Sequence, residues 1–397
     1  MPEAVIVDVV RTASGRGKPG GALSGVHPAN LLAAVIAAVV ERNGIDGATI
    51  DDVIAGCVGQ AGDQALNIGR TAVLVAGLPE SVPATTIDRQ CGSSQQALHF
   101  AVQGVMAGSY DIAIACGVES MSRVPMGSAN AGGDAFAPLA ARYPEGLVNQ
   151  GVSAELITKK WDLSRARLDE YAARSHERAS SAARDGAFER EILPIAVAGA
   201  DGSMTAHLVD ETVRATTTAE GLSGLRSSFR TDELAARFPD LTWDITPGNS
   251  SPLTDGASAT LVMSADRAAQ LGLKPRARVT AMAVTGSDPL LMLTGVIPAT
   301  EKVLARAGLT IDDIDAYEVN EAFAPVPLAW AAELGADESR LNPLGGAIAL
   351  GHPLGGSGTR LLTTLLHHLE STGGRYGLQT MCEGGGMANA TVIERIS

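Results

Sequence analysis

One short motif occurs twice in this chain, and the spacing around it constrains the fold more than any other feature. Thr-Ile-Asp-Asp followed by a β-branched residue begins at Thr49 and again at Thr310. Cys91 lies 42 positions after Thr49, and His352 lies 42 positions after Thr310. In each half a helix-like segment and then a strand-like segment with a cysteine come next. The spacing predicts gene duplication, with one reactive side chain at an equivalent turn of each half and both turns facing one cleft.

Strand-like and helix-like segments alternate along the first 120 residues. Helical spacing over 28–43 has Pro28 near its start and Gly44 just past its end, as helix termini prefer. A second helix is expected over 93–108. Short apolar runs predict strands at 5–10, 51–58, 85–89 and 112–117. This alternation is typical of an α/β fold with a largely parallel, buried sheet.

The composition of the sequence and its strand–helix alternation change between 121 and 247. Gly, Ala, Ser and Pro are dense over 125–151, and a helix follows with Ser164 as N-cap and Gly186 as its stop. A Thr-, Arg- and Ser-rich stretch comes next, and the alternation then resumes. We interpret the segment as an insertion, which divides the chain into three parts: 1–120 plus 248–268, the inserted 121–247, and 269–397.

Composition excludes several classes of protein. The net charge of −14 argues against a nucleic-acid partner, which needs a basic surface. No window approaches the roughly 18 apolar residues of a membrane span, and the N-terminus resembles neither a signal nor a transit peptide. The four cysteines are scattered without a CxxC pair, which argues against a zinc site and a disulfide framework. We expect a cytoplasmic protein with reduced thiols, no metal and no membrane insertion.

Cys91 lies in DRQCGSSQQAL, between a strand-like and a helix-like segment. Unpaired backbone N–H groups and the positive end of the helix dipole meet at such a position, and both lower the pKa of a thiol from about 8.5. We therefore expect an activated nucleophile. The alternative is a small buried apolar residue, which is the commoner role of cysteine.

His352 lies in a glycine-rich stretch, GGAIALGHPLGGSG, which we expect to be another strand–turn–helix site. Glycine at this density lets the backbone approach a ligand closely. The stretch matches neither the P-loop nor the dinucleotide-binding pattern. A lone histidine is usually structural, and His367 and His368 on the following helix are interpreted in that way.

Cys382 is followed by Glu383 and three glycines that begin at Gly384. Glycine backbone offers N–H donors and no side chains to block a substrate, which is what an oxyanion hole requires. Glu383 would point to the opposite face of a strand from Cys382 and is assigned no role. Asn320 lies in VNEAFA, where a strand ends and a helix begins, and its alternative role is an N-cap.

Taken together, these segments resemble the thiolase superfamily. DRQCGSSQQA, NEAFA, GGAIALGHPLGGSG and CEGGGMA occur in that family's order and approximate positions, and GNSSPLTDGA at 248–257 extends the resemblance over essentially the whole chain. The resemblance implies an α/β thiolase fold, in which duplicated βαβ halves form a layered αβαβα arrangement with an inserted loop domain. It also implies an acyltransferase without a prosthetic group, whose substrates are acyl groups carried on coenzyme A.

The resemblance further implies roles for the candidate residues. Cys91 would attack the acyl thioester and carry the acyl group, while His352 takes the thiol proton. Cys382 would exchange a proton with the α-carbon of acetyl-CoA. Asn320 would position a water that forms one oxyanion hole with His352, and the backbone N–H groups of Cys91 and Gly384 would form the second.

Coenzyme A contacts are implied in and beside the inserted segment. Arg214 is the candidate for the nucleotide end, Phe229 for the pocket lining, and Ser251 for the pantetheine arm. Arg226 and Phe323 complete the set, and for both arginines the alternative is a solvated surface. Members of the family are homo-oligomers, so a homodimer or homotetramer is expected.

Departures from the family pattern bear on the substrate. Short-chain biosynthetic members carry His-Met where this chain has Asn149 and Gln150. Pro252 follows Ser251, and the connection before Ser251 is long. These differences favour a degradative 3-ketoacyl-CoA thiolase that accepts a longer or bulkier acyl group, such as a branched or cyclic one. The alternative is a biosynthetic acetoacetyl-CoA thiolase.

More remote alternatives are a decarboxylating condensing enzyme, a non-catalytic CoA- or lipid-binding protein on the same scaffold, and a zinc module. Condensing enzymes generally use Cys-His-His or Cys-His-Asn sites, so the second cysteine at 382 favours a thiolase. The intact set of Cys91, Asn320, His352 and Cys382 argues against a protein that only binds.

Overall fold

The computed structural model describes residues 2–199 and 202–396. The first third contains the expected strands and helices, and Ser93 is the first residue of the helix beside Cys91. Pro28 is the first residue of its helix, and the His27 side chain accepts a hydrogen bond from the backbone of Ala29, which caps it. The elements are β1 (Ala4–Thr12), β2 (Gly15–Arg16), α1 (Pro28–Glu41), β3 (Asp52–Gly56), α2 (Ile68–Val75), β4 (Ala84–Ile87), α3 (Ser93–Met106) and β5 (Ile112–Ser120).

The last third repeats this order with small differences. Its two final strands form a hairpin closed by Gly384–Gly386, and Gly385 and Gly386 have φ angles of 80° and 79°, which glycine adopts without strain. The elements are β9 (Thr254–Ser264), α8 (Ala265–Gln270), β10 (Ala277–Gly286), α9 (Val296–Ala307), β11 (Ala316–Val319), α10 (Pro325–Leu334), α11 (Ala347–Leu350), α12 (Ser357–Thr372), β12 (Tyr376–Glu383) and β13 (Met387–Arg395).

The strand order mirrors itself about the centre of the sheet: β11-β12-β13-β10-β1-β9-β5-β3-β4. Strands β1 and β10 join the two halves through a short antiparallel ladder. The expectation of a largely parallel sheet is wrong. Strands β9 and β13 each run antiparallel to both of their neighbours, and β13 follows β12 through a hairpin rather than a crossover helix.

The duplication is real, but its register differs from the one that the motif indicates. Three pairs of equivalent elements begin at a constant separation: β3 and β11 at Asp52 and Ala316, α3 and α12 at Ser93 and Ser357, and β5 and β12 at Ile112 and Tyr376. Asp51 accepts hydrogen bonds from the first backbone N–H groups of β5, and Asp315 does the same for β12. This separation is three residues longer than that between the two motifs. The equivalent of Cys91 is therefore Gly355, and His352 precedes it by three residues.

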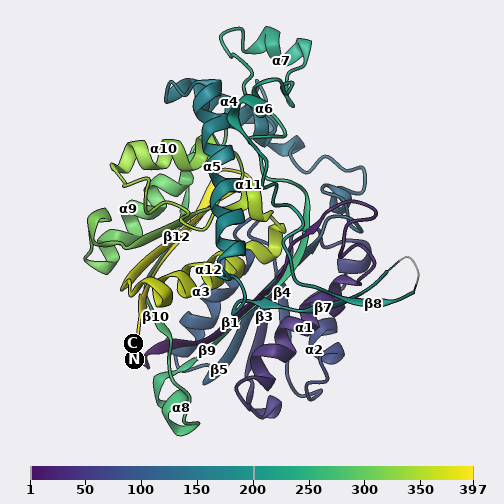
Figure 1. Cartoon of the computed structure of the whole chain (residues 1–397), viewed down its shortest axis with the longest axis vertical. Helices are drawn as coiled ribbons and strands as arrows, with labels where there is room; N and C mark the ends of the chain where they lie inside the picture. The colour runs from purple at the N-terminus through teal and green to yellow at the C-terminus, as the bar shows by residue number, and fades with distance from the viewer. Residues whose placement is uncertain (1, 200–201, 397) are drawn as a thin grey trace.

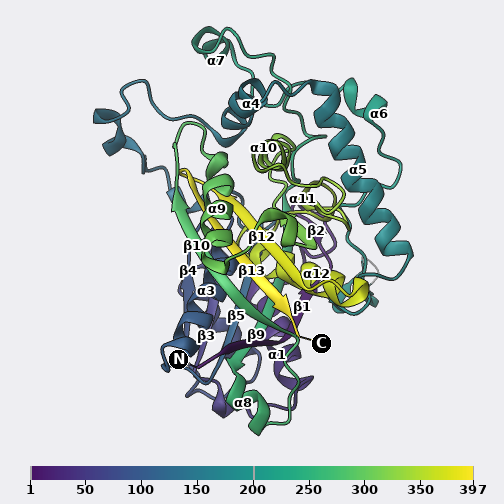
Figure 2. The ribbon, with the colours of Figure 1, turned by 90° about the vertical axis from the view of Figure 1, so that its left-hand side faces the viewer.

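The elements form five layers (Figures 1 and 2). Helices α3 and α12 pack against each other between the strands of the two halves, while α1 and α2 cover the outer face of the first half and α9 covers that of the second. Leu98, Val102, Leu362 and Leu366 fill the middle layer together with Ile6 of β1. Each fully buried side chain of this kind contributes about 1.5–3 kcal/mol.

The elements of the inserted segment are α4 (Gln150–Lys160), α5 (Arg165–Arg184), β6 (Ile192–Leu193), β7 (Ile195–Ala198), β8 (Met204–His207), α6 (Ala219–Ser223) and α7 (Asp232–Arg237). Helices α4, α6 and α7 lie at the top of Figure 1, α5 runs down from them along the layers, and β7 and β8 lie lower, at the right. The Ser164 side chain caps α5 by accepting from Arg167 N, and Gly186 follows the helix with a φ of 75°, so both predicted ends are confirmed. No helix among residues 2–199 and 202–396 is long and apolar enough to cross a membrane.

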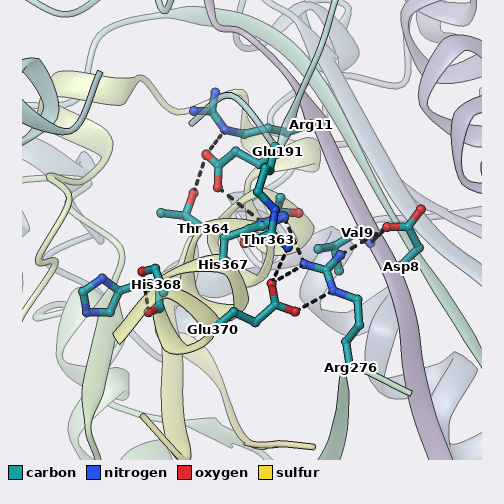
Figure 3. Close-up of polar contacts among 12 residues, drawn as sticks. Asp8, Val9, Arg11, Glu191, Arg276, Thr363, Thr364, His367, His368 and Glu370 are labelled. Atoms are coloured by element: carbon teal, nitrogen blue, oxygen red, sulfur yellow. Dashed lines mark hydrogen bonds and ion pairs between the residues drawn. The ribbon is translucent and has the colours of Figure 1, made fainter. Parts of the chain in front are cut away.

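Buried charges tie the insertion to the layers (Figure 3). Arg11 of β1 is fully buried, and it donates to Glu191 at 2.6 Å and to both oxygens of Asp210 at 2.7 and 3.0 Å. Thr364 of α12 donates to the same Glu191 oxygen. Next to them, His367 contacts its own helix backbone and Arg276, which supports a structural role for this histidine.

Candidate active site

Cys91 occupies a tight turn between β4 and α3. Gln90 has a φ of 49°, and the Ser93 hydroxyl holds the turn by accepting from Arg89 N and donating to Gln90 O. A Cβ on Gly92 would lie 2.1 Å from an oxygen of Glu383 and 2.1 Å from an oxygen of Asn389, so only glycine fits there. The turn therefore presses against the hairpin that carries Cys382, and Cys91 is only 5% exposed.

The expected low pKa of Cys91 is wrong. Burial raises the pKa of this thiol to about 12, and the charge of Glu383 acts in the same direction. The backbone hydrogen bond at Cys91 and the side-chain amide of Gln150 lower it. The increase in pKa from loss of hydration is thus larger than the decrease from the helix terminus. The resting side chain is therefore a neutral thiol.

His352 follows a short helix, α11, and Gly351, where a strand was expected. Gly351 has a φ of 84°, and an added Cβ would meet Thr254 at 2.7 Å. The Thr254 hydroxyl accepts a hydrogen bond from His352 N at 2.9 Å. Burial lowers the pKa of His352 to about 3, and the charge of Arg360 lowers it further. The imidazole is therefore neutral, as a general base must be.

Two hydrogen bonds define the tautomer of His352. Ser357 Oγ donates its single proton to Pro353 O at 2.9 Å, so it accepts from His352 Nδ1 at 2.5 Å. Nδ1 therefore carries the proton of the neutral ring, and Nε2 is unprotonated, with a lone pair that can accept a proton. Asn320 Nδ2 lies 3.4 Å from Nε2, and the Asn320 backbone N donates to Thr380 O.

Cys382 is fully buried near the end of β12. Burial raises the pKa of its thiol well above the ordinary value, and a charge on Cys91 acts in the same direction. Gly384 lies against Gln90, whose Oε1 would be 2.8 Å from a Cβ at that position. Cys91 also packs with Leu354, two residues beyond His352. The junction of α3, α12 and β12 is therefore surrounded by the side chains of Cys91, Asn320, His352 and Cys382.

The residues expected to bind coenzyme A form two groups. Phe229 and Phe323 pack edge to face with centroids 5.9 Å apart, and Ser251 N donates to Ala322 O beside them. Arg214 and Arg226 are exposed on the inserted segment. Among the described residues, neither guanidinium forms an ion pair with a carboxylate.

Sequence reasoning missed Gln150 and Ser357 as site residues and dismissed Glu383. Gln150 begins α4 and reaches Cys91 from the inserted segment. Ser357 lies in the same glycine-rich stretch as His352, five residues on, so its spacing was a usable signal. The chain contains no comparable local signal for Gln150 or Glu383, because both meet Cys91 only through the tertiary fold.

Comparison with known proteins agrees with this geometry. The family model for the N-terminal domain of thiolase matches residues 4–266, and that for the C-terminal domain matches 273–395. A steroid 3-ketoacyl-CoA thiolase of Mycobacterium tuberculosis is 46% identical over 405 residues, which cover 100% of this chain and 95% of that protein. A 3-ketoacyl-CoA thiolase of Serratia proteamaculans is 46% identical over 400 residues, with 100% of both chains covered.

A solved structure shows the same arrangement in three dimensions. The acetyl-CoA acetyltransferase of Bacillus anthracis superposes with a TM-score of 0.89 at 35% identity, and the match covers 100% of this chain and 99% of that one. The fold and the matches define an acyltransferase enzyme. The chain belongs to the thiolase family.

Proposed function

We propose that this enzyme cleaves 3-ketoacyl-CoA thioesters with coenzyme A, giving acetyl-CoA and a shortened acyl-CoA through an acyl-Cys91 intermediate. The observation that carries the proposal is a neutral imidazole at His352, whose unprotonated Nε2 can accept a proton, two residues before Leu354, which packs with the buried Cys91 thiol. The relatives at 46% identity that are named 3-ketoacyl-CoA thiolases support the degradative direction.

In the first half-reaction, His352 takes the proton of Cys91, and the sulfur attacks the 3-keto carbon. The bond between C2 and C3 then breaks, its electron pair stays on the acetyl-CoA fragment, and Cys382 protonates that carbon. In the second half-reaction, the Cys382 thiolate takes the proton of the coenzyme A thiol, and the coenzyme A sulfur displaces the acyl group from Cys91, whose sulfur recovers its proton from the His352 imidazolium. Proton transfer from Cys91 to His352 forms a thiolate and an imidazolium at the same time. The attraction between these opposite charges offsets much of the free-energy cost of desolvating each.

Two sets of donors would stabilise the oxyanions. His352 Nε2, once it holds the proton of Cys91, would serve one oxygen together with a water bound to the Asn320 amide, which lies 3.4 Å from Nε2. The backbone N–H groups of Cys91 and Gly384 would serve the other. Removal of one such donor typically costs about 100- to 1000-fold in rate.

The substrate would extend from these residues in two directions. Arg214 and Arg226 would hold the phosphates of coenzyme A, and Phe229, Ser251 and Phe323 would line the pantetheine arm. An open groove of about 440 Å³ adjoins the glycine turn after Cys382 and supports a long or bulky acyl group. Its apolar lining includes Phe136, Leu139, Tyr143, Leu147, Pro289 and Met387.

We also propose the three-part division of the chain at 120, 247 and 268, a cytoplasmic location, and a homodimer or homotetramer. Strand β9 supports the division, since it follows the insertion and lies between β1 and β5. The four free cysteines support a reducing compartment. Analytical ultracentrifugation would measure the oligomeric state.

The test is a substrate profile. Purified enzyme is assayed for CoA-dependent cleavage of acetoacetyl-CoA and of 3-ketoacyl-CoA thioesters with longer, branched and cyclic acyl groups, and Cys91→Ala serves as the control. We expect kcat/KM to be higher for at least one bulky substrate than for acetoacetyl-CoA. A preference for acetoacetyl-CoA would support the biosynthetic alternative, and no cleavage of any thioester would overturn the proposal.

A further inference from the structure

Glu383 is a carboxyl group without an evident function, buried beneath the catalytic turn. It is the last residue of β12 and has 0% of its surface exposed. Among residues 2–199 and 202–396, neither of its carboxyl oxygens has a hydrogen-bond partner. A buried carboxylate without donors is strongly destabilising, so its protonation state or its surroundings must compensate.

A second acceptor that is unpaired in the described part of the chain, Asn389 Oδ1, lies close to Glu383. Glu383 Oε1 and Asn389 Oδ1 each lie 2.1 Å from the point where a Cβ on Gly92 would be, so they can be no more than twice that distance apart. Within the described residues, Asn389 Oδ1 also lacks a partner, while Asn389 Nδ2 donates to Gln96 Oε1 at 3.2 Å. Rotation of the Asn389 amide alone would bring its oxygen against Gln96 Oε1 and create a second acceptor–acceptor contact.

A proton on Glu383 resolves this contact. A neutral carboxyl group has one O–H donor, and Asn389 Oδ1 is an unpaired acceptor beside it at Gly92. The electrostatics agree, since burial raises the pKa of Glu383 to about 9. Arg89 opposes that shift and Asp88 adds to it, and both come from the connection before α3. Strand β13 contributes the uncharged Asn389.

The charge on Glu383 matters because Cys91 lies on the other side of Gly92. An ionised Glu383 raises the pKa of the Cys91 thiol and also that of Cys382. A thiolate at Cys91 and a carboxylate at Glu383 would compete for the one positive helix terminus at Ser93. A neutral Glu383 leaves that terminus to the thiolate.

We propose that Glu383 is a positioning residue for Cys91: it is held neutral under Gly92 by a hydrogen bond to Asn389, which permits the thiolate to form. The link to catalysis rests on the proposed function, whereas the effect on the thiol does not. Ionisation of Glu383 at alkaline pH then opposes ionisation of Cys91, and the two groups titrate as a coupled pair.

The test follows alkylation of Cys91 by iodoacetamide between pH 6 and pH 10.5, with the modified peptide quantified by mass spectrometry. Wild type is compared with Glu383→Gln, which is always neutral, and with Glu383→Asp, which still ionises. At pH 7 we expect the Gln variant to react within twofold of wild type. At pH 10 we expect it to react about tenfold faster, because no carboxylate opposes its thiolate. The pH dependence of Cys91 alkylation in the Asp variant should match that of wild type.

Two outcomes would overturn the inference. The first is a Gln profile that matches wild type or differs by the same factor at every pH, which is what a merely structural role would give. The second needs no variant: a wild-type profile that fits one ionisation with unit slope would exclude a coupled acid. Alkylation requires no acyl transfer, so an enzyme that cleaves no thioester but shows the expected profiles would refute the proposed function alone.

Discussion

Ser357 Oγ lies 2.5 Å from Nδ1 of His352 and donates its own hydrogen bond to Pro353 O, so the serine holds the imidazole in the tautomer with an unprotonated Nε2. The two residues are five positions apart, and α12 begins at Ser357. The helix terminus therefore fixes the orientation of the general base through a single hydroxyl group.

Replacement of Ser357 should impair proton transfer more than substrate binding. In Ser357→Ala, His352 loses the acceptor for its Nδ1 proton, and we expect kcat to fall by about 10- to 100-fold with little change in KM. Ser357→Thr retains a hydroxyl and should recover most of the rate. Steady-state thiolysis kinetics measure both effects, and equal kinetics for the Ala and Thr variants would refute the role of the hydroxyl.

Removal of the nucleophile should abolish turnover. Cys91→Ala is expected to lower kcat by about 10⁴-fold or more, since no acyl-enzyme can form. Cys116→Ala and Cys57→Ala, which replace two other buried thiols, should retain activity. Mass spectrometry after incubation with substrate should find the acyl group on the Cys91 peptide, and an acylated peptide around Cys57 or Cys116 would contradict the assignment.

Asn320 should contribute as an oxyanion donor. Asn320→Ala removes the amide that lies 3.4 Å from His352 Nε2, and a kcat reduction of about 100- to 1000-fold is expected. Asn320→Asp, which offers acceptors only, should be at least as impaired. A thermal unfolding scan serves as the control, and full activity in either variant would exclude the role.

Gly92 should tolerate no side chain. In Gly92→Ala the new methyl group would lie 2.1 Å from oxygens of Glu383 and Asn389, so the turn with Cys91 must shift. We expect a loss of activity of about 100-fold or more, because misplaced reacting groups lose rate steeply. Gly224→Ala is a matched control, since that position has open space and a φ of −79°. Similar activity in the two variants would contradict the packing argument.

Buried histidines should weaken the fold in acid. Burial lowers the pKa of His99 to about 3, so between pH 6.5 and pH 3 the unfolded state binds a proton that the folded state does not. This costs about 1.4 kcal/mol of stability for each pH unit below 6.5. His99→Gln can keep the contact to the Thr391 hydroxyl without titrating.

Urea unfolding of wild type and His99→Gln at pH 7, 6 and 5 measures this effect. The difference between the two proteins isolates His99 from Glu318, where burial raises the pKa to about 8 and acts in the opposite direction. The variant should lose less stability on acidification than wild type. Parallel pH profiles would show that His99 is not a buried neutral base.

Local features of the chain were predictable because short-range interactions fix them. Pro28 and Ser164 set helix starts through their own backbone geometry and hydroxyl group, and Gly186 supplied the left-handed turn after a helix. The turn that holds Cys91 and the turn that follows Cys382 could also be predicted, since their glycine residues and the neighbouring strand and helix patterns identify them.

The sequence by itself determined the duplication, the helix and strand order around each turn, and the chemical groups of the site. Only the tertiary structure decided the antiparallel insertion of β9 and β13, the three-residue shift of the repeat, and the raised pKa of Cys91. Glu383 and Gln150 reach Cys91 from segments distant in sequence. Hydration loss and electrostatic interaction depend on distances in space, and no local pattern of residues encodes those distances.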